Sequence, residues 1–276
     1  MKLVETFLTK NPCYRTGKKI AVKGLMLHSV GCPQPKASVF INLWNRTDYL
    51  NSCVHAFIDG NDGTVYQTLP WNHRGWHCGS GKKGSGNNSY IGVEMCEPSC
   101  IEYTGGSSFC CSDLTTAKAV AKRTYWSAVE LFAMLCKEYN LDPLADGVII
   151  SHKEGYKKGI ASNHADPEHL WKGLGLSYTM KGFRNDVKAE MEKTGDGTLS
   201  STVTEKDVFK SYKVRVSIKD LNIRKGPGTN YSKTGKYTGK GKFTIVEERA
   251  GKGSTRGWGR LKSGAGWISL DYVTKI

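Results

Sequence analysis

Apolar residues occur along the first half of the chain in short runs of two kinds, one typical of strands and the other of helices. Apolar positions at three- and four-residue intervals predict helices at 36–51 and 114–139. Asn61-Asp62-Gly63 favours a tight hairpin turn between two of the strands, because Asp-Gly tolerates positive φ angles. The strands are predicted at 22–30, 53–59, 64–70, 89–95 and 146–152. These elements predict a mixed α/β domain.

The texture of the chain changes towards its C-terminus. After residue 211, short β-type runs separated by Gly, Lys and Ser predict a small all-β barrel, and no helical pattern occurs there. The stretch before it, 194–207, is small and polar, as linkers are. We therefore expect a first domain at 1–194, a linker at 195–211 and a second domain at 212–276.

Charge is concentrated in the second of these domains. The chain has a formal net charge of +15. Residues 212–276 hold 15 Lys and Arg against 4 Asp and Glu, an excess of 11, whereas residues 1–194 hold 23 against 18. Such a field attracts a polyanion, which leaves nucleic acid, an anionic membrane surface or an anionic cell wall as partners.

Neither a membrane span nor a secretory signal is expected from the sequence. No apolar run approaches the ~20 residues that cross a bilayer. The N-terminal segment is interrupted by Glu5, Thr6 and Thr9, so it lacks the continuous apolar core of a signal peptide.

Nine cysteines, all before residue 140, leave at least one unpaired because the number is odd. Four of them gather in one short stretch: Cys96, Cys100, Cys110 and Cys111. Reduced thiols, local disulfides and a second, structural zinc site are all compatible with this spacing.

Candidate chemistry lies where predicted strands end or loops begin. His28 ends GLMLH, His152 ends VIISH, and His164 and Asp166 follow in SNHADP. Neutral imidazole and carboxylate are zinc ligands, and a catalytic zinc needs three protein ligands with a fourth position open for water. His28, His152 and Asp166 would form such a set. Spacing alone leaves open the alternative of satisfied structural histidines.

The surrounding segments resemble the zinc amidases of the N-acetylmuramoyl-L-alanine amidase type 2 family. They are VHAFIDGNDGTVYQTLPWNHRGWHCG, NNSYIGVEM, SHKEG and HADP, in that order, and the resemblance covers roughly residues 20–185. It implies a mixed central sheet flanked by helices, a Zn²⁺ ion bound by His28, His152 and Asp166, and Glu94 of IGVE as the general base. A zinc-activated water would then cleave the amide between N-acetylmuramic acid and L-alanine in peptidoglycan.

The resemblance has one departure. Many family members place a lysine two residues before the last ligand, where this chain has His164; an imidazole N–H could donate to the same oxyanion. Trp76 and His77 are similar to residues that form the wall of the family's substrate groove, although Trp76 could equally be core. His55 is expected to be a hydrogen-bonded core histidine, and His73 and His169 are expected at the surface.

The C-terminal segment, through LNIRKGPGTNY, resembles bacterial SH3-like domains. This implies binding to peptidoglycan, with the positive charge favouring anionic wall polymers. A nucleic-acid partner is not expected, because no recognition helix or basic aromatic platform is present.

Two further readings concern function and location. A catalytically silent peptidoglycan receptor of the same fold is the competing interpretation, although it would not need an open zinc site. The absence of a signal together with a wall-binding domain favours a phage endolysin that is stored in the host cytoplasm and released by a separate pore. An exported autolysin stays possible, and the oligomeric state stays open.

Overall fold

The computed structural model describes residues 1–50, 52–193, 211–249 and 251–276. The chain divides into two compact units, Met1–Asp196 and Gly197–Ile276. Except for residue 211, the linker expected at 195–211 lies outside the described residues. The two units are therefore described separately.

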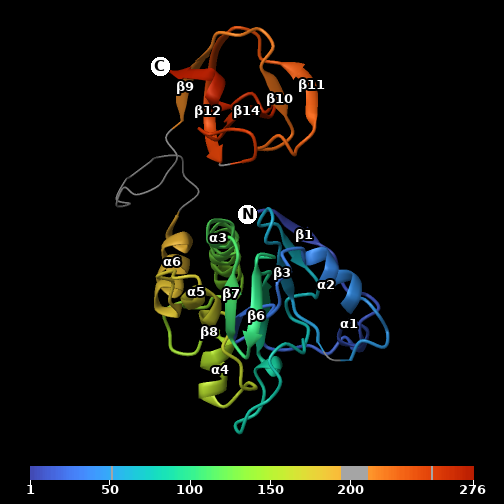
Figure 1. Cartoon of the computed structure of the whole chain (residues 1–276). Coiled ribbons are helices and arrows are strands. Elements are labelled where there is room, and N and C mark those ends of the chain that lie inside the picture. Colours follow the sequence, from blue (N-terminus) through green and yellow to red (C-terminus); the bar gives the residue numbers. More distant parts are fainter. Residues whose placement is uncertain (51, 194–210, 250) are drawn as a thin grey trace. The chain divides into compact units, whose positions relative to one another are not determined.

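A six-stranded mixed sheet forms the centre of the first unit (Figure 1). Its order is β1-β4-β3-β5-β2-β8, and all neighbouring strands are parallel except β3 and β4. The strands are β1 (Leu3–Glu5), β2 (Gly24–Ser29), β3 (Ala56–Ile58), β4 (Val65–Gln67), β5 (Tyr90–Met95) and β8 (Ile149–Ser151). The predicted mixed α/β fold is confirmed.

One long helix, α3 (Leu114–Glu138), covers one face of this sheet. It begins at the N-cap Asp113, whose side chain accepts from the Thr116 N–H, and α6 packs beside it (Figure 1). The predicted helix 114–139 is confirmed. The other helices are α1 (Pro12–Thr16), α2 (Ala37–Trp44), α4 (His152–Lys158), α5 (Glu168–Gly173), α6 (Met180–Glu192) and the short 3₁₀ helix η1 (Gly86–Asn88).

Side chains alternate across the two central strands, as the pleat of a strand requires. One set of positions on β2 and β5 lies in the core beneath α3: Leu25, Leu27, Ile91 and Val93. The intervening positions face the opposite side of the sheet: Met26, His28, Gly92 and Glu94. A polar set of side chains is thereby gathered on one face.

Local connections agree with the sequence in one place and differ in two. Antiparallel pairing of β3 with β4 confirms the predicted hairpin, and Gly63 has a φ of +77° in its turn. The helix expected at 36–51 ends at Trp44, because Asn45 already leaves the helical conformation. The stretch rich in Pro, Gly and Ser at 96–100 is a loop, and the residues after it form a hairpin that the sequence analysis did not predict, of β6 (Ile101–Gly105) and β7 (Ser108–Cys111).

The second unit is an antiparallel sheet around its own apolar core. The order is β11-β10-β14-β13-β12-β9-β15. The strands are β9 (Tyr212–Val216), β10 (Asn222–Arg224), β11 (Lys233–Tyr237), β12 (Gly241–Arg249), β13 (Trp258–Leu261), β14 (Trp267–Ser269) and β15 (Val273–Lys275). One short 3₁₀ helix, η2 (Leu270–Tyr272), interrupts the otherwise all-β unit, which was expected to contain no helix.

The structure also bears on the cysteines and on possible membrane spans. All nine cysteines are free thiols in the structure. Among the residues it describes, no helix has the length and apolar character of a membrane span.

Candidate metal centre and active site

Polar side chains from three adjacent strand ends meet on the sheet face opposite α3. His28 of β2 and Glu94 of β5 are register partners, so they lie next to each other. His152 follows β8 directly and is the first residue of α4, which Ser151 starts with a capping box. Asp166 lies in the segment just before α5. The topology therefore brings together residues that are far apart in the chain.

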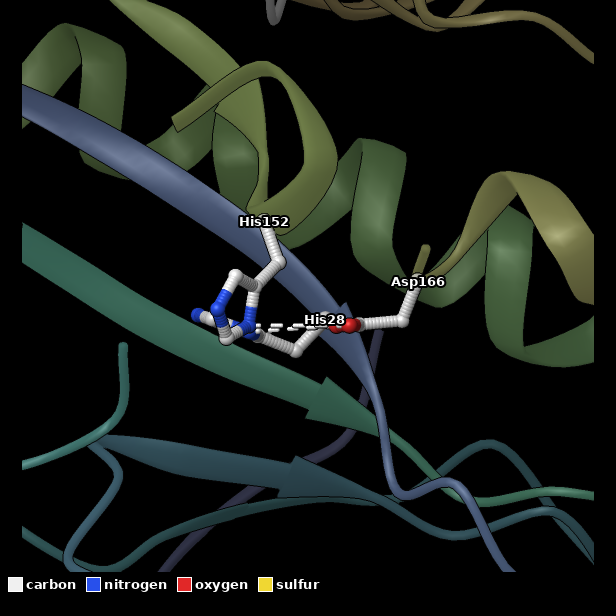
Figure 2. Close-up of side chains that lie close together, drawn as sticks. All are labelled: His28, His152 and Asp166. Carbon is white, nitrogen blue, oxygen red and sulfur yellow. Dashed lines mark hydrogen bonds and ion pairs between the residues drawn. The ribbon is translucent and has the colours of Figure 1, made fainter. Parts of the chain in front are cut away.

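His28, His152 and Asp166 form a compact buried cluster (Figure 2). Nδ1 of His28 lies 3.1 Å from Nδ1 of His152 and 3.2 Å from Oδ2 of Asp166. Nδ1 of His152 lies 3.5 Å from Oδ1 of Asp166. Within the described part of the chain this is the single group of three or more His, Cys, Asp or Glu side chains arranged to hold a metal ion, so the cysteine zinc site considered above is not found there.

A chain of hydrogen bonds sets the proton positions on His28. Nε2 of His77 lies 3.1 Å from the Tyr90 carbonyl oxygen, which can only accept, so this nitrogen carries the proton. Burial, followed by the neighbouring His28, holds the pKa of His77 well below its ordinary value. The neutral His77 ring therefore accepts at Nδ1 from Nε2–H of His28, 3.0 Å away. In a neutral His28 ring, Nδ1 then has a free lone pair directed at the cluster.

Ser162 sets the proton position on His152, as His77 does on His28. Its hydroxyl donates to the Cys78 carbonyl oxygen at 3.2 Å, and its oxygen lies 3.2 Å from Nε2 of His152. The oxygen accepts from Nε2–H, which leaves Nδ1 of His152 unprotonated as well. Burial, the first cause, together with His28 lowers the pKa of His152 to about 3. Both imidazoles thus turn Nδ1 towards the cluster and Nε2 towards an outer hydrogen-bond partner.

The cluster fits a divalent metal. Nδ1 of His28, Nδ1 of His152 and the Asp166 carboxylate all point at one another, so a cation at their centre could take the place of any proton that they share. Two imidazoles with one carboxylate form a donor set that zinc accepts, and three ligands leave a position open. The hydrogen bonds from His77 and Ser162 are the outer partners that such ligands use to hold their orientation.

Glu94 lies beside the cluster in a cavity of about 590 Å³. Its Oε2 is shielded from solvent and has no hydrogen-bond partner. Burial, with added repulsion from Asp166 and Glu97, raises the pKa of Glu94 well above its ordinary value. A raised pKa makes the ionised form of this carboxyl group a stronger base, which is the property that a general base needs.

Comparison with known proteins identifies the family of this chain. A family model described as N-acetylmuramoyl-L-alanine amidase matches residues 18–169, more than half of the chain. The chain belongs to the N-acetylmuramoyl-L-alanine amidase family. The matched region includes all three residues of the cluster and Glu94.

Individual relatives agree with this membership. The amidase-family chain is 30% identical over 213 residues to N-acetylmuramoyl-L-alanine amidase XlyB of Bacillus subtilis, covering 72% of this chain and 54% of XlyB. It is 54% identical over 43 residues to XlyA of the same organism, covering 16% of this chain and 14% of XlyA. The chain thus spans about half or less of these relatives. The structure of Staphylococcus aureus hydrolase AmiA in complex with its ligand matches with a TM-score of 0.51 at 20% identity, over 69% of this chain and 83% of AmiA, which shows the shared fold.

The remaining predicted site residues of this amidase-family chain take different positions. His164 lies at the cavity rim with 61% of its side chain exposed, and its ring centroid is 4.4 Å from that of His152. His77 lines the cavity, and its Nδ1 also forms a hydrogen bond with Nε2 of His28, a residue of the cluster. Trp76 does not line this cavity; its ring is partly exposed beneath the Arg74 guanidinium.

Three other histidines can be placed as well. His55 is a buried core histidine, as expected: its Nδ1 accepts from the Gly92 N–H, and Nε2 donates to the His73 carbonyl oxygen. The surface positions expected for His73 and His169 are wrong. His73 is buried, and the His169 side chain is only 9% exposed and lines the cavity.

The sequence analysis missed a buried network on the same cavity. The Tyr103 hydroxyl donates to Oε2 of Glu97 at 2.8 Å and lies 2.7 Å from Nε2 of His169. Desolvation raises the pKa of Glu97 to about 7. Glu97 lies three residues beyond Glu94, in the stretch that drew attention only for its cysteines; a carboxylate in that apolar surrounding was the available signal.

Proposed function

We propose that this protein is a zinc hydrolase that cleaves the amide bond between N-acetylmuramic acid and L-alanine of the peptidoglycan stem peptide. The observation that supports it best is the convergence of the Nδ1 atoms of two imidazoles and a carboxylate beside Glu94, whose Oε2 has no hydrogen-bond partner. Which bond is cleaved, and in which polymer, is inferred from family membership and from the names of the relatives.

His28, His152 and Asp166 would hold the zinc ion. When bound, zinc polarises a carbonyl group and lowers the pKa of water towards neutrality. Glu94, which lines the same cavity, would take a proton from water and pass it to the departing L-alanine amine. His164 at the rim would donate a hydrogen bond to the carbonyl oxygen as negative charge develops there.

A peptidoglycan receptor without activity is the second candidate. Such a receptor would bind the same ligand, peptidoglycan, in the same cavity. Glu94 argues against it, because a receptor gains nothing from a desolvated carboxylate without a partner, which costs free energy of folding.

The second unit is proposed as an SH3-like module that binds the cell wall. Its excess of 11 positive charges favours anionic wall polymers over an uncharged glycan. Together with the amidase unit this favours an endolysin of a phage, kept in the host cytoplasm until a separate pore releases it to the wall.

The test is an assay of new amino termini on purified cell walls. Wild-type protein should release L-alanine amino termini, lose this activity with a chelator and regain it with Zn²⁺. The Glu94→Gln variant, which keeps the ligands, is the matched control and should bind walls without cleaving them. New reducing sugar ends without new amino termini would mean a glycosidase, and wall binding by wild type without any cleavage would favour the receptor.

A further inference from the structure

A second cavity, of about 510 Å³, adjoins the catalytic one. Asn163 lines both cavities. Ser162, which also lines the second cavity, contacts Nε2 of His152 through its hydroxyl oxygen. The second cavity therefore begins one side chain away from a residue of the metal cluster.

The wall of this cavity is basic and only partly neutralised. Four lysines line it, and Lys158 is paired with Asp146, its Nζ lying 2.9 Å from either carboxylate oxygen. The other three, Lys82, Lys83 and Lys157, are exposed and form no ion pair with any described residue. Like charges gathered at one hollow repel each other and attract an anion from solution. We call these three residues the lysine subsite.

The backbone of the lysine subsite is fixed against the end of α4. Gly81 and Gly84 bridge each other, and the N–H of Lys83 donates to the Gly159 carbonyl oxygen at 2.8 Å. A Cβ atom on Gly81 would lie 2.3 Å from that same oxygen, so only glycine permits this approach. Two lysines are thereby held beside Lys157, and a site built in this way loses little freedom when it binds.

We propose that the lysine subsite binds the free α-carboxylate of the second residue of the stem peptide, the glutamate that follows L-alanine. This inference rests on the proposed function, since it assumes that the scissile amide lies at the metal cluster. Two residues of extended chain span about 7 Å, and Asn163 lines both the catalytic cavity and the second one, so we place the second residue of the stem peptide there. Tyr156, 47% exposed on the same wall, offers an aromatic face to the peptide backbone.

The experiment uses the full chain and two soluble muramoyl tripeptides that differ only in whether the glutamate α-carboxyl group is free or amidated. Wild type should cleave the free form with a kcat/KM about tenfold higher at low ionic strength, chiefly through KM, because an interaction made equally in ground and transition states changes KM alone. The triple variant Lys82→Gln, Lys83→Gln, Lys157→Gln should lose this preference while cleaving the amidated form as wild type does.

A matched control removes the same charge from elsewhere in the unit. Lys122, Lys137 and Lys181 are exposed and line neither cavity, so their triple Gln variant should keep the preference. Equal kcat/KM for both tripeptides in wild type, or equal losses on both in the lysine-subsite variant, would overturn the inference while leaving the amidase function intact. A wild-type protein that cleaves neither tripeptide nor intact walls would overturn the proposed function itself. Loss confined to walls that bear phosphate polymers would assign the lysine subsite to phosphate and overturn the carboxylate.

Discussion

Replacing His77 by phenylalanine should weaken zinc binding without removing any ligand. His77 accepts the Nε2–H of His28 and donates to the Tyr90 carbonyl oxygen. A phenylalanine ring fills a similar volume but does neither, so the His28 proton loses its buried acceptor and the ring loses what fixes its tautomer.

The expected loss follows from that one bond. Removing an outer hydrogen bond from a metal-bound histidine typically costs ten- to a hundredfold in affinity, which is about 1.4 to 2.7 kcal/mol. This agrees with about 1.5 to 3 kcal/mol for a hydrogen bond to a charged group, which His28 becomes in effect when it binds a cation. Ser162→Ala, which removes the acceptor for His152, should cost less, because water can more easily replace a hydroxyl that is only partly buried.

The assay is competition for Zn²⁺ against a chromogenic chelator of known affinity, with circular dichroism to verify folding. His77→Gln is the rescue variant, since its amide can accept from His28 and donate to Tyr90 as the imidazole does. His55→Gln is the control, a buried histidine that contacts no residue of the cluster by hydrogen bond. If His77→Phe bound zinc within twofold of wild type, the argument for the His28 tautomer would be refuted.

Three further outcomes are expected. Glu94→Gln should reduce kcat by at least about a hundredfold while zinc affinity stays near that of wild type, measured by the same competition; near-normal kcat would exclude Glu94 as the base. Burial lowers the pKa of His55 to about 4 from 6.5, so between these values the unfolded chain binds more protons. The free energy of unfolding of the metal-free protein should then fall as the pH falls from 6.5 to 4, by up to about 3 kcal/mol, and urea titrations of His55→Gln should show a shallower slope. Deleting residues 195–276 should weaken wall binding more than cleavage of soluble fragments, and sedimentation with walls should show that the lost part is the salt-sensitive part.

Long, periodic segments were predictable from the sequence, and elements that depend on distant partners were not. The helix α3 is predictable because its apolar residues recur at three- and four-residue intervals within one segment. The strand β1 was missed because three residues become a strand only by pairing with β4, sixty residues away in the chain. The strand predicted at 53–59 is shorter, since Cys53 leaves the sheet to form an isolated bridge with Trp76.

The candidate site divides in the same way. Residue types and motif order pointed to His28, His152 and Asp166, and the structure brings them together. The strand predicted at 146–152 was too long, because β8 ends at Ser151 and His152 begins α4; the spacing of Ser151 and Glu154 as a capping box was the signal for that helix. The hydrogen bonds between His77 and His28 and between Ser162 and His152 could not be predicted from the sequence, because they depend on which atoms face each other in the folded chain.

The glycine of the IGVE strand has a consequence for anyone who wishes to redesign this protein. A methyl group on Gly92 would lie 2.3 Å from the His77 ring, so the imidazole occupies the space that a side chain at position 92 would fill. Positions 77 and 92 therefore behave as one unit, and substitutions at them should combine non-additively. In a mutagenesis library that varies the two positions independently, most variants would have a side chain at position 92 that clashes with the one at position 77. A library that allows a larger residue at position 92 only together with a smaller one at position 77 would avoid this clash.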